Sequence, residues 1–413
     1  MKINNKVSKI GIDKGDAFMQ KSVIVAGART PFGKFGGTLR ARTASQLGGV
    51  AIKAAIERAN VEDEHIDEVI MGNVLQGGQG QLPSRQAARE AGISWNVKTE
   101  TVNKVCASGL RSITLADQLI RLGDEEVVVA GGMESMSNTP YILPDARWGY
   151  RMGDKQVVDM MVHDGLTCAF NDVHMGTYGN STADEFEINR KEQDEWAYRS
   201  HQRAIQAIDS GKFKEEIVPV TIPQRKGNPI TIVEDEAPRK DTSVEKLSTL
   251  RPAFGKDGTI TAGNAPGIND GACAFVVMSE ERAERENKQP LANIIAHTEV
   301  AVETENFPQT PGIVINKLLD KAGKKVEDID LFEINEAFSV VSLTSIKIAG
   351  LNPDKVNVNG GAVALGHPIG ASGARIVLTL IHELKRRGGG LGIAAICSGG
   401  GQGDAILIDV PKQ

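Results

Sequence analysis

Two cysteines and a histidine lie beside glycine-rich segments, in positions where they could carry out acyl transfer. Cys106 follows the run TVNKV and comes directly before Ala107, Ser108 and Gly109, where a helix is expected to begin. A thiol at a helix start feels the positive end of the helix dipole and the free N–H groups there, which lower its pKa. Cys106 is therefore a candidate nucleophile, and a small buried packing residue is the alternative.

His367 is the candidate base for that thiol. It lies between Gly366 and Pro368 in the glycine-dense stretch NGGAVALGHPIGASG. The constrained backbone leaves little room for an ordinary core side chain. An imidazole within hydrogen-bonding reach of a thiol can accept its proton. The alternative is a structural histidine that only satisfies a local hydrogen bond.

Cys397 and Asn335 each follow an apolar segment that reads as a buried strand. Cys397 ends GIAAI and begins CSGGGQG, and Asn335 follows LFEI with Glu336 beside it. Ligands bind at the carboxyl ends of strands in open α/β sheets, and the N–H groups of a glycine loop can hold an oxyanion. Packing is the alternative for Cys397, and a turn or helix cap is the alternative for Asn335.

Together these groups fit acyl transfer through a thioester. One thiolate would take the acyl group, and the second thiol would remove a proton from the carbon next to a thioester carbonyl. The sequence has no Walker loop, and no GxGxxG motif follows its first strand. Its four cysteines form no CxxC pair, so we expect no metal site and free thiols. Cys168 and Cys273 are expected to be packing residues.

An internal repeat predicts how these residues are positioned. Residues 48–74 resemble residues 312–338, each reading as a helix, an acidic turn and an apolar strand. ASGLR at 107–111 likewise matches ASGAR at 371–375. The repeat places Gly370 at the position that corresponds to Cys106, so the repeat itself does not need a cysteine there. Pseudo-twofold symmetry is expected to bring the Cys106 and His367 loops into one cleft.

The repeat also predicts the domain organisation. Helices alternating with apolar strands indicate two α/β layer structures with mostly parallel strands covered on both faces. The first half is interrupted after Met136 by a segment rich in Pro, Gly, His, Met and charge, within which 189–212 predicts a solvated surface helix. The predicted units are a disordered leader (1–20), an N-terminal half (21–137 and 269–289), an inserted loop domain (138–268) and a C-terminal half (290–413).

Charge and composition exclude several classes of protein. The chain carries 47 basic and 53 acidic residues, a net charge of -6, which gives no overall field for nucleic acid or an anionic membrane surface. No stretch of 18 apolar residues is present, so we expect no membrane span. The first twenty residues lack the apolar core of a signal peptide. A cytoplasmic protein is therefore expected.

The chain resembles the thiolase family, and within it the acetyl-CoA C-acetyltransferases, from about Lys21 to Val410. The matching motifs are ARTPFGKFGG from Ala28, NKVCASGLRS from Asn103, GGMESMSN from Gly131, TAGNAPGINDGA from Thr261, INEAF from Ile334, NVNGGAVALGHPIGASGAR from Asn357 and CSGGGQGD from Cys397. The resemblance implies a duplicated five-layer α/β/α/β/α fold with an inserted loop domain that binds coenzyme A. It also implies a homodimer or homotetramer.

The resemblance further implies roles for five residues in a ping-pong mechanism. Cys106 would be acylated and His367 would accept its proton, while Cys397 would be the acid/base of the condensation step. Asn335, through a water molecule, and His367 would hold the enolate oxygen. The N–H groups of Cys106 and Gly399 would hold the tetrahedral intermediate.

The resemblance also suggests contacts for coenzyme A, which is expected as a substrate and product, with no tightly bound cofactor. Arg239 would lie near its adenine and phosphate end, and His174 and Met175 in the wall of the pantetheine or acyl pocket. Pro266 stands where many thiolases have a serine that contacts pantetheine, and it has neither hydroxyl nor N–H. Phe307 stands near a position where short-chain members commonly carry Met, so acyl-chain selectivity stays open.

The expected reaction is the reversible condensation of two acetyl-CoA to acetoacetyl-CoA and CoA. A degradative 3-ketoacyl-CoA thiolase acting on longer chains is the main alternative. The condensing enzymes of fatty-acid synthesis resemble this family but lack a second cysteine in CxGGG, so Cys397 argues against them. A carrier that binds CoA without catalysis is the remaining alternative, and Cys106, His367 and Cys397 argue against it.

Overall fold

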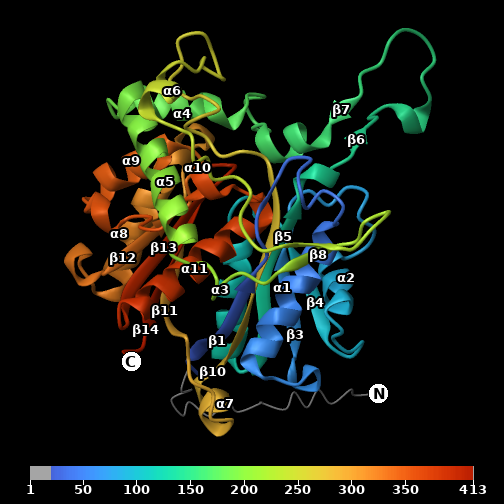
Figure 1. Ribbon diagram of the computed structural model, residues 1–413, viewed down its shortest axis with the longest axis vertical. Coiled ribbons are helices and arrows are strands. Elements are labelled where there is room, and N and C mark those ends of the chain that lie inside the picture. The colour runs from blue at the N-terminus through green and yellow to red at the C-terminus, as the bar shows by residue number, and fades with distance from the viewer. Residues whose placement is uncertain (1–19, 413) are drawn as a thin grey trace, which may run out of the picture.

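The computed structural model describes residues 20–412, so the predicted leader lies outside the described residues except for Gln20. Within residues 20–412, no helix is long and apolar enough to cross a membrane. The two sequence repeats form two similar halves that lie side by side (Figure 1). The first half contains β1 (Ser22–Arg29), β2 (Gly33–Lys34), α1 (Ala44–Ala59), β3 (Glu68–Gly72), α2 (Pro83–Glu90), β4 (Lys98–Val102), α3 (Ser108–Leu122), β5 (Val127–Ser135), β10 (Asn269–Ser279) and α7 (Glu280–Arg285). The second contains β11 (Ala292–Ala301), α8 (Thr310–Ala322), β12 (Leu331–Ile334), α9 (Ser339–Ala349), α10 (Ala362–Leu365), α11 (Ile369–Arg386), β13 (Gly390–Ser398) and β14 (Gln402–Val410).

The strands form a mixed sheet in the order β12-β13-β14-β11-β1-β10-β5-β3-β4, and β1 pairs with β11 where the halves join. The prediction of mostly parallel strands is wrong. Only β3 with β4, β3 with β5 and β12 with β13 are parallel among the pairs of this sheet. One reason is the hairpin between β13 and β14, in which Gly400 and Gly401 have φ values of +79° and +73°. This tight turn reverses the chain where a helical crossover would have kept the strands parallel.

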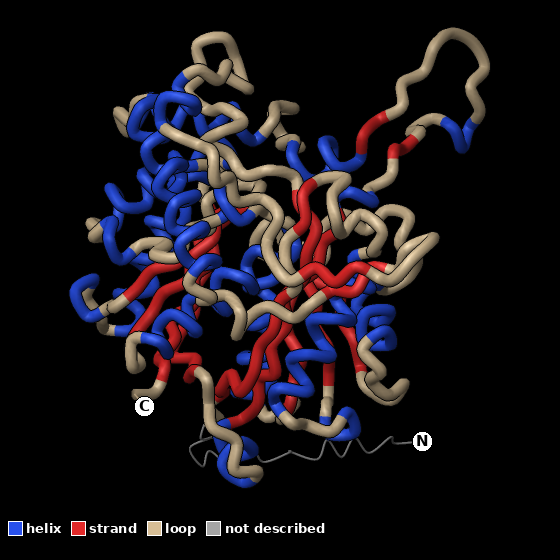
Figure 2. The backbone as a smooth tube through the Cα atoms, in the orientation of Figure 1, coloured by secondary structure: helices blue, strands red, loops and turns tan. Residues whose placement is uncertain are grey.

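The helices divide the molecule into five layers. The helices α1 and α2 cover the outer face of the first half's strands, and α8, with α9 packed against it, covers that of the second half. Between the two sets of strands lie α3 and α11, which pack against each other and against strands of both halves. Figure 2 shows the strands as two adjoining red groups, with blue helices beside and between them. Three apolar cores fill the spaces between these layers, and the core around α3 and α11 contacts the strands of both halves.

Local sequence signals fix where these helices begin and end. The helix α1 begins with a capping box, in which the side chains of Thr43 and Gln46 each bond the other's backbone N–H. It ends at Asn60, which has the left-handed conformation typical of helix C-termini. Its apolar face, including Leu47 and Ile52, is fully buried against the sheet. Each such side chain contributes roughly 1.5–3 kcal/mol on burial.

The starts of α3 and α11 approach closely because glycines line their contact. A Cβ atom on Gly109 would lie 2.8 Å from the carbonyl oxygen of Gly370, and one on Gly373 would lie 2.5 Å from the backbone nitrogen of Leu110. Real Cβ atoms do not approach backbone atoms this closely. The glycines therefore permit the contact that brings the loop before α3, which carries Cys106, next to the loop before α11, which carries His367.

Gly373→Ala is expected to destabilise the protein by about 1–3 kcal/mol, because the new methyl group would push the central helices apart. At a spacious helix site the same change would stabilise by about 1 kcal/mol. The measurement is the free energy of unfolding from urea titration. Gly179→Ala, in another helix where the nearest atom would lie at 3.3 Å, is the control and should be close to neutral. A Gly373→Ala variant as stable as the wild type would contradict this packing argument.

The segment between β5 and β10 contains the remaining helices and strands. These are β6 (Tyr141–Ile142), β7 (Val158–Asp159), α4 (Met175–Glu185), α5 (Arg190–Asp209), β8 (Val220–Ile222), β9 (Ile230–Ile232) and α6 (Val244–Ser248), besides a π-helical turn at Met161–Leu166. Both α4 and α5 pack against α9 of the second half, and α5 also packs against α10. The β6–β7 hairpin extends away from the body of the molecule (Figure 1). The prediction of a solvated helix at 189–212 is wrong in one respect, because one face of α5 is buried.

Candidate active site

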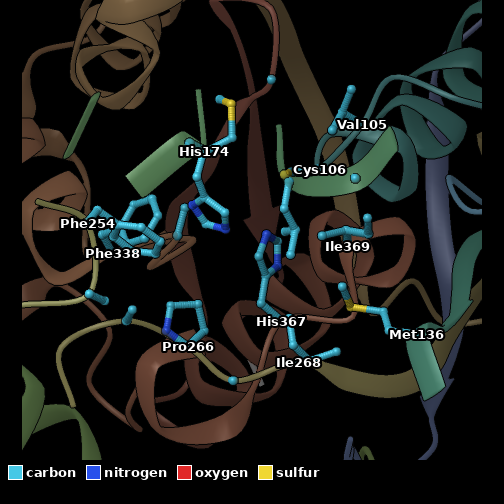
Figure 3. Close-up of a pocket in the computed structure, with 18 of the residues that line it drawn as sticks. Val105, Cys106, Met136, His174, Phe254, Pro266, Ile268, Phe338, His367 and Ile369 are labelled. Atoms are coloured by element: carbon cyan, nitrogen blue, oxygen red, sulfur yellow. The ribbon is translucent and has the colours of Figure 1, made fainter. Parts of the chain in front are cut away.

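A largely apolar cavity of about 240 Å³ opens where the loops before α3 and α11 meet (Figure 3). Three residues singled out for catalysis, Cys106, His367 and Gly399, line this cavity. So do His174, Met175, Pro266 and Phe307, which were singled out for coenzyme A and acyl-chain contacts. Substrate pockets for larger ligands span roughly 300–1,000 Å³. This cavity is smaller, so its size suits an acyl group and a narrow linking arm rather than a whole nucleotide.

A strained turn places Cys106 at the cavity. The residue before it, Val105, has φ +47°, a left-handed conformation that β-branched residues rarely adopt and that costs about 1–3 kcal/mol. The turn is held locally: the Val105 N–H donates to Asn103 Oδ1 at 3.0 Å, and the Ser108 hydroxyl donates to the Val105 carbonyl at 2.6 Å. Cys106 therefore sits on a sharp bend between β4 and α3, with its side chain at the cavity (Figure 3).

The expectation of a lowered pKa for Cys106 is wrong for the resting site. Burial, with a smaller contribution from the nearby Glu134 carboxylate, raises the pKa of the thiol to about 12. The backbone N–H groups of Gly399 and Cys106 stabilise the thiolate and oppose this rise. One donor, the Cys106 N–H, thus comes from the expected helix start and the other from the turn between β13 and β14, but desolvation outweighs both. Ionisation of Cys106 therefore depends on a base that takes its proton.

His367 is arranged to be that base. Its Nδ1 lies 2.6 Å from Ser372 Oγ, and the Ser372 hydroxyl donates its only proton to the Pro368 carbonyl at 2.9 Å. Nδ1 must then carry the ring proton, which leaves Nε2 with a free lone pair. Nε2 is buried and has no hydrogen-bond partner within residues 20–412. The backbone N–H of His367 donates to Asn269 Oδ1 at 3.0 Å, which fixes the loop.

His367 is expected to stay neutral well below the ordinary histidine pKa of about 6.5. Burial, together with the charge of Arg375, lowers its pKa to about 3. Unfolded chains take up this proton near pH 6.5 and the folded protein does not, so His367 removes stability as the pH falls from about 6.5 towards 3. NMR titration of the ring, assigned with a His367→Asn variant, should show no protonation step between about pH 8 and 5. A midpoint near 6.5 would contradict this electrostatic account.

Cys397 and Asn335 lie behind the cavity wall. Cys397 is the penultimate residue of β13 and is completely buried, beside Phe307, Ala337 and Phe338. Burial and the neighbouring Cys106 charge raise its pKa well above the ordinary thiol value. Asn335 directly follows β12, and its buried side-chain amide has no partner within the described residues. A buried amide of this kind is available to hold a water molecule or an oxygen of a ligand.

The residues predicted to contact coenzyme A separate into two groups. His174 stacks on Phe254 with ring centroids 4.2 Å apart, and together with Met175 and Pro266 it lines the cavity. Arg239 does not line this cavity. Its side chain is exposed, and its backbone N–H donates to His201 at 3.1 Å. Within residues 20–412, no three His, Cys, Asp or Glu side chains lie close enough together to hold a metal ion.

Family models match nearly the whole described chain: "Thiolase, N-terminal domain" over residues 22–281 and "Thiolase, C-terminal domain" over residues 288–410. The chain belongs to the thiolase family. A probable acetyl-CoA acetyltransferase of Mycobacterium tuberculosis is 51% identical to this thiolase over 390 residues, which cover 94% of this chain and 99% of that protein. The acetyl-CoA acetyltransferase of Chromobacterium violaceum is 50% identical over 388 residues, covering 94% and 99%.

A solved structure supports the same family assignment. The crystal structure of the Bacillus anthracis acetyl-CoA acetyltransferase matches this thiolase with a TM-score of 0.94 at 44% identity, covering 95% of this chain and 100% of that one. The expected thiolase fold is therefore confirmed.

In the second half of this thiolase, a protein side chain occupies the site equivalent to that of Cys106. Gly370 stands at the equivalent position, and its N–H donates to the carboxylate of Glu134 at 3.0 Å. The same buried carboxylate also accepts from the Asn73 side chain at 2.8 Å and from the backbone N–H groups of Val74 and Leu75. A protein carboxylate thus occupies the helix start of the second half, within residues 20–412, whereas the Cys106 side leaves its helix start open to the cavity.

Sequence reasoning missed the role of Glu336, beside Asn335. Its carboxylate accepts from Trp196 Nε1 at 2.9 Å and from the Ser200 hydroxyl at 2.8 Å, both on α5. It also accepts from the Asn357 side chain at 2.9 Å. These contacts hold the segment after β12, and with it Asn335, against the buried face of α5. The only sequence signal was the adjacency of Asn and Glu in INEAF, which did not show what the carboxylate would bind.

Proposed function

We propose that this thiolase is an acetyl-CoA C-acetyltransferase, which interconverts two acetyl-CoA with acetoacetyl-CoA and free CoA. The observation that carries the proposal is the pairing, at one small apolar cavity, of Cys106 with the unprotonated Nε2 of His367. The names of relatives at about 50% identity over nearly the whole chain support the choice of substrate.

In the first half-reaction, His367 Nε2 takes the Cys106 proton as the sulfur attacks the thioester carbonyl of acetyl-CoA. The N–H groups of Cys106 and Gly399 stabilise the tetrahedral oxyanion, a role supported by the place of both residues at the cavity and by their stabilisation of the Cys106 thiolate. The bond between the carbonyl carbon and the CoA sulfur then breaks. His367 returns the proton to that sulfur, so CoA leaves as a thiol and Cys106 carries the acetyl group.

In the second half-reaction, Cys397 first gives up its own proton to solvent, and its thiolate then removes a proton from the methyl carbon of a second acetyl-CoA. Asn335, through a water molecule, and His367 hold the enolate oxygen. The enolate carbon attacks the acetyl group on Cys106, forming the new carbon–carbon bond and releasing the Cys106 thiolate, which regains the proton from Cys397. Acetylation assists this step, because an acetylated Cys106 cannot ionise and so no longer contributes to the raised pKa of Cys397.

The proposed domains are an N-terminal half (21–137 and 269–289), an inserted loop domain (138–268) and a C-terminal half (290–413). Coenzyme A is proposed to bind between the inserted loop domain and the two halves. His174, Met175 and Pro266 would contact its pantetheine arm, which is supported by their place at the cavity. Arg239 would contact its phosphates from outside the cavity, which is supported by its exposure. CoA acts as substrate and product, and no tightly bound cofactor is proposed.

We further propose a cytoplasmic homodimer or homotetramer. Four free cysteines suit a reducing compartment. The strand β4 is the last in the sheet and pairs only with β3 within the described residues. The hairpin segment exposes large apolar side chains, including Trp148 at 84% and Met152 at 92% exposure. An open strand edge and exposed apolar side chains favour association with a second copy.

The chain-length preference decides between this function and a degradative 3-ketoacyl-CoA thiolase. The assay is CoA-dependent thiolysis of the four-carbon acetoacetyl-CoA and of a ten-carbon 3-ketoacyl-CoA, side by side. We expect a kcat/KM at least about tenfold higher for the short substrate, because each methylene that a closed pocket rejects costs about 1–3 kcal/mol. Phe307 is buried at the cavity wall, where it would close the pocket. A preference for the long substrate would support the degradative enzyme, and no thiolysis of either would support a carrier.

A further inference from the structure

Lys104, two residues before the proposed nucleophile, is held by the opposite half of the molecule. Its ammonium lies 2.8 Å from Asp404 Oδ2 on β14 and also contacts the Glu299 carboxylate on β11. Its backbone carbonyl accepts a hydrogen bond from the Ser398 hydroxyl at 2.6 Å. The Lys104 side chain is 13% exposed and that of Asp404 is 3% exposed, so this ion pair is largely removed from water. Lys104 therefore joins the two halves beside the cavity.

These contacts join the two segments that carry the backbone donors of the proposed oxyanion hole. One donor is the N–H of Cys106, in the segment that Lys104 begins, and the other is the N–H of Gly399, directly after Ser398. Both lower the pKa of the same sulfur, that of Cys106. Because the donors belong to different halves, their separation depends on noncovalent contacts between the two segments. Packing adds to these contacts, since a Cβ atom on Gly399 would lie only 3.3 Å from the Val105 side chain.

We propose that Lys104 is a positioning residue that sets the separation of the Cys106 and Gly399 N–H groups, through its contacts with Ser398 and Asp404. This inference rests on the proposed function, in which those N–H groups stabilise the tetrahedral intermediate. The role of Lys104 is to position these groups rather than to contact the substrate, because its ammonium faces two carboxylates of the other half. An oxyanion hole works only when both donors reach the place where charge develops.

Lys104→Met removes the ammonium and keeps a side chain of similar length. We expect kcat for acetoacetyl-CoA thiolysis to fall about 10- to 100-fold, because loss of one oxyanion donor costs about 10²–10³-fold and here both donors remain, but displaced. KM should change less than about threefold, since the cavity wall is intact. Rapid-quench measurement of acetyl-enzyme formation should show the same loss. Lys104→Arg, which keeps the ion pair, should recover most of kcat.

Arg121→Met is the matched control. Arg121 also pairs with a buried carboxylate, Asp117 on α3 at 2.8 Å, and Asp117 contacts His297 of the other half at 3.1 Å. Arg121 also donates to the Ile294 carbonyl of the other half at 3.2 Å, so it joins the halves at the far end of α3. Its loss should lower the free energy of unfolding but leave kcat at the wild-type value. If Lys104→Met only destabilises the protein, as Arg121→Met is expected to do, the positioning role is wrong.

Two further outcomes decide the inference. Where Lys104→Met does not fold, Ser398→Ala removes only the hydrogen bond to the Lys104 carbonyl and should lower kcat in the same direction; wild-type kcat in that variant would overturn the proposal. Failure of Lys104→Arg to recover activity would also overturn it. Absence of acetyl-enzyme in the wild type is a different result, because it would refute the proposed function itself.

Discussion

Replacing Cys106 with serine is expected to lower acetyl transfer at least about 10³-fold while leaving the fold intact. A hydroxyl is a much weaker nucleophile than a thiol and needs a stronger base to ionise it. His367 is a weak base, because burial lowers its pKa to about 3 and its Nδ1 faces the Ser372 hydroxyl rather than a carboxylate. The serine side chain is nearly the same size as cysteine, so packing around the turn should not change.

Thiolysis of acetoacetyl-CoA measures this effect, with thermal unfolding as the check on folding. Cys168→Ser is the control, because Cys168 lies outside the cavity lining and its sulfur faces Thr304 at 3.2 Å, where a hydroxyl can replace it. That variant should keep wild-type activity. Undiminished thiolysis by Cys106→Ser would refute the assignment of the nucleophile.

Replacing Cys397 with alanine is expected to separate the two half-reactions. Acetyl-enzyme should form at nearly the wild-type rate, because this step uses Cys106, His367 and the Gly399 N–H. Condensation should fall about 10²–10⁴-fold, which is the contribution of a positioned acid–base group. Cys397 is fully buried beside Phe307, so loss of its sulfur should also destabilise the protein modestly.

Single-turnover experiments distinguish these steps. Incubation with acetyl-CoA should release about one CoA per active site, after which formation of acetoacetyl-CoA should stall. Thermal unfolding shows whether the small cavity left by alanine has affected the fold. Loss of acylation in a folded Cys397→Ala variant would mean that Cys397 takes part in the first step and that its assigned role is wrong.

The internal duplication, and the proximity of the loops that carry Cys106 and His367, can be predicted from the sequence because both depend on local patterns. The matching ASGLR and ASGAR segments predict equivalent helix starts, and these are the starts of α3 and α11 in the structure. Strand direction does not follow from such patterns. A buried strand reads the same in parallel and antiparallel pairs, and the hairpin at Gly400 and Gly401 reverses β14.

Burial of charged groups and contacts between residues far apart in the sequence explain the other differences between the predictions and the structure. The sequence places Cys106 at a helix start but does not show how deeply the sulfur is buried, and burial reverses the direction of its pKa shift. The sequence likewise does not show which groups donate hydrogen bonds to Glu336 and Glu134. Trp196 is 140 residues from Glu336, and Gly370 is 236 residues from Glu134. Contacts at such separations depend on the complete fold.

Direct localisation of the acetyl group tests the central claim, that Cys106 is the residue acylated by acetyl-CoA. The purified protein is mixed with acetyl-CoA, quenched in acid and digested, and the peptides are mapped by mass spectrometry. The account predicts a single thioester-linked acetyl group on Cys106, which free CoA removes when it is added before the quench. An acetyl group on Cys397 or any other residue, or no acetylated peptide at all, would contradict it.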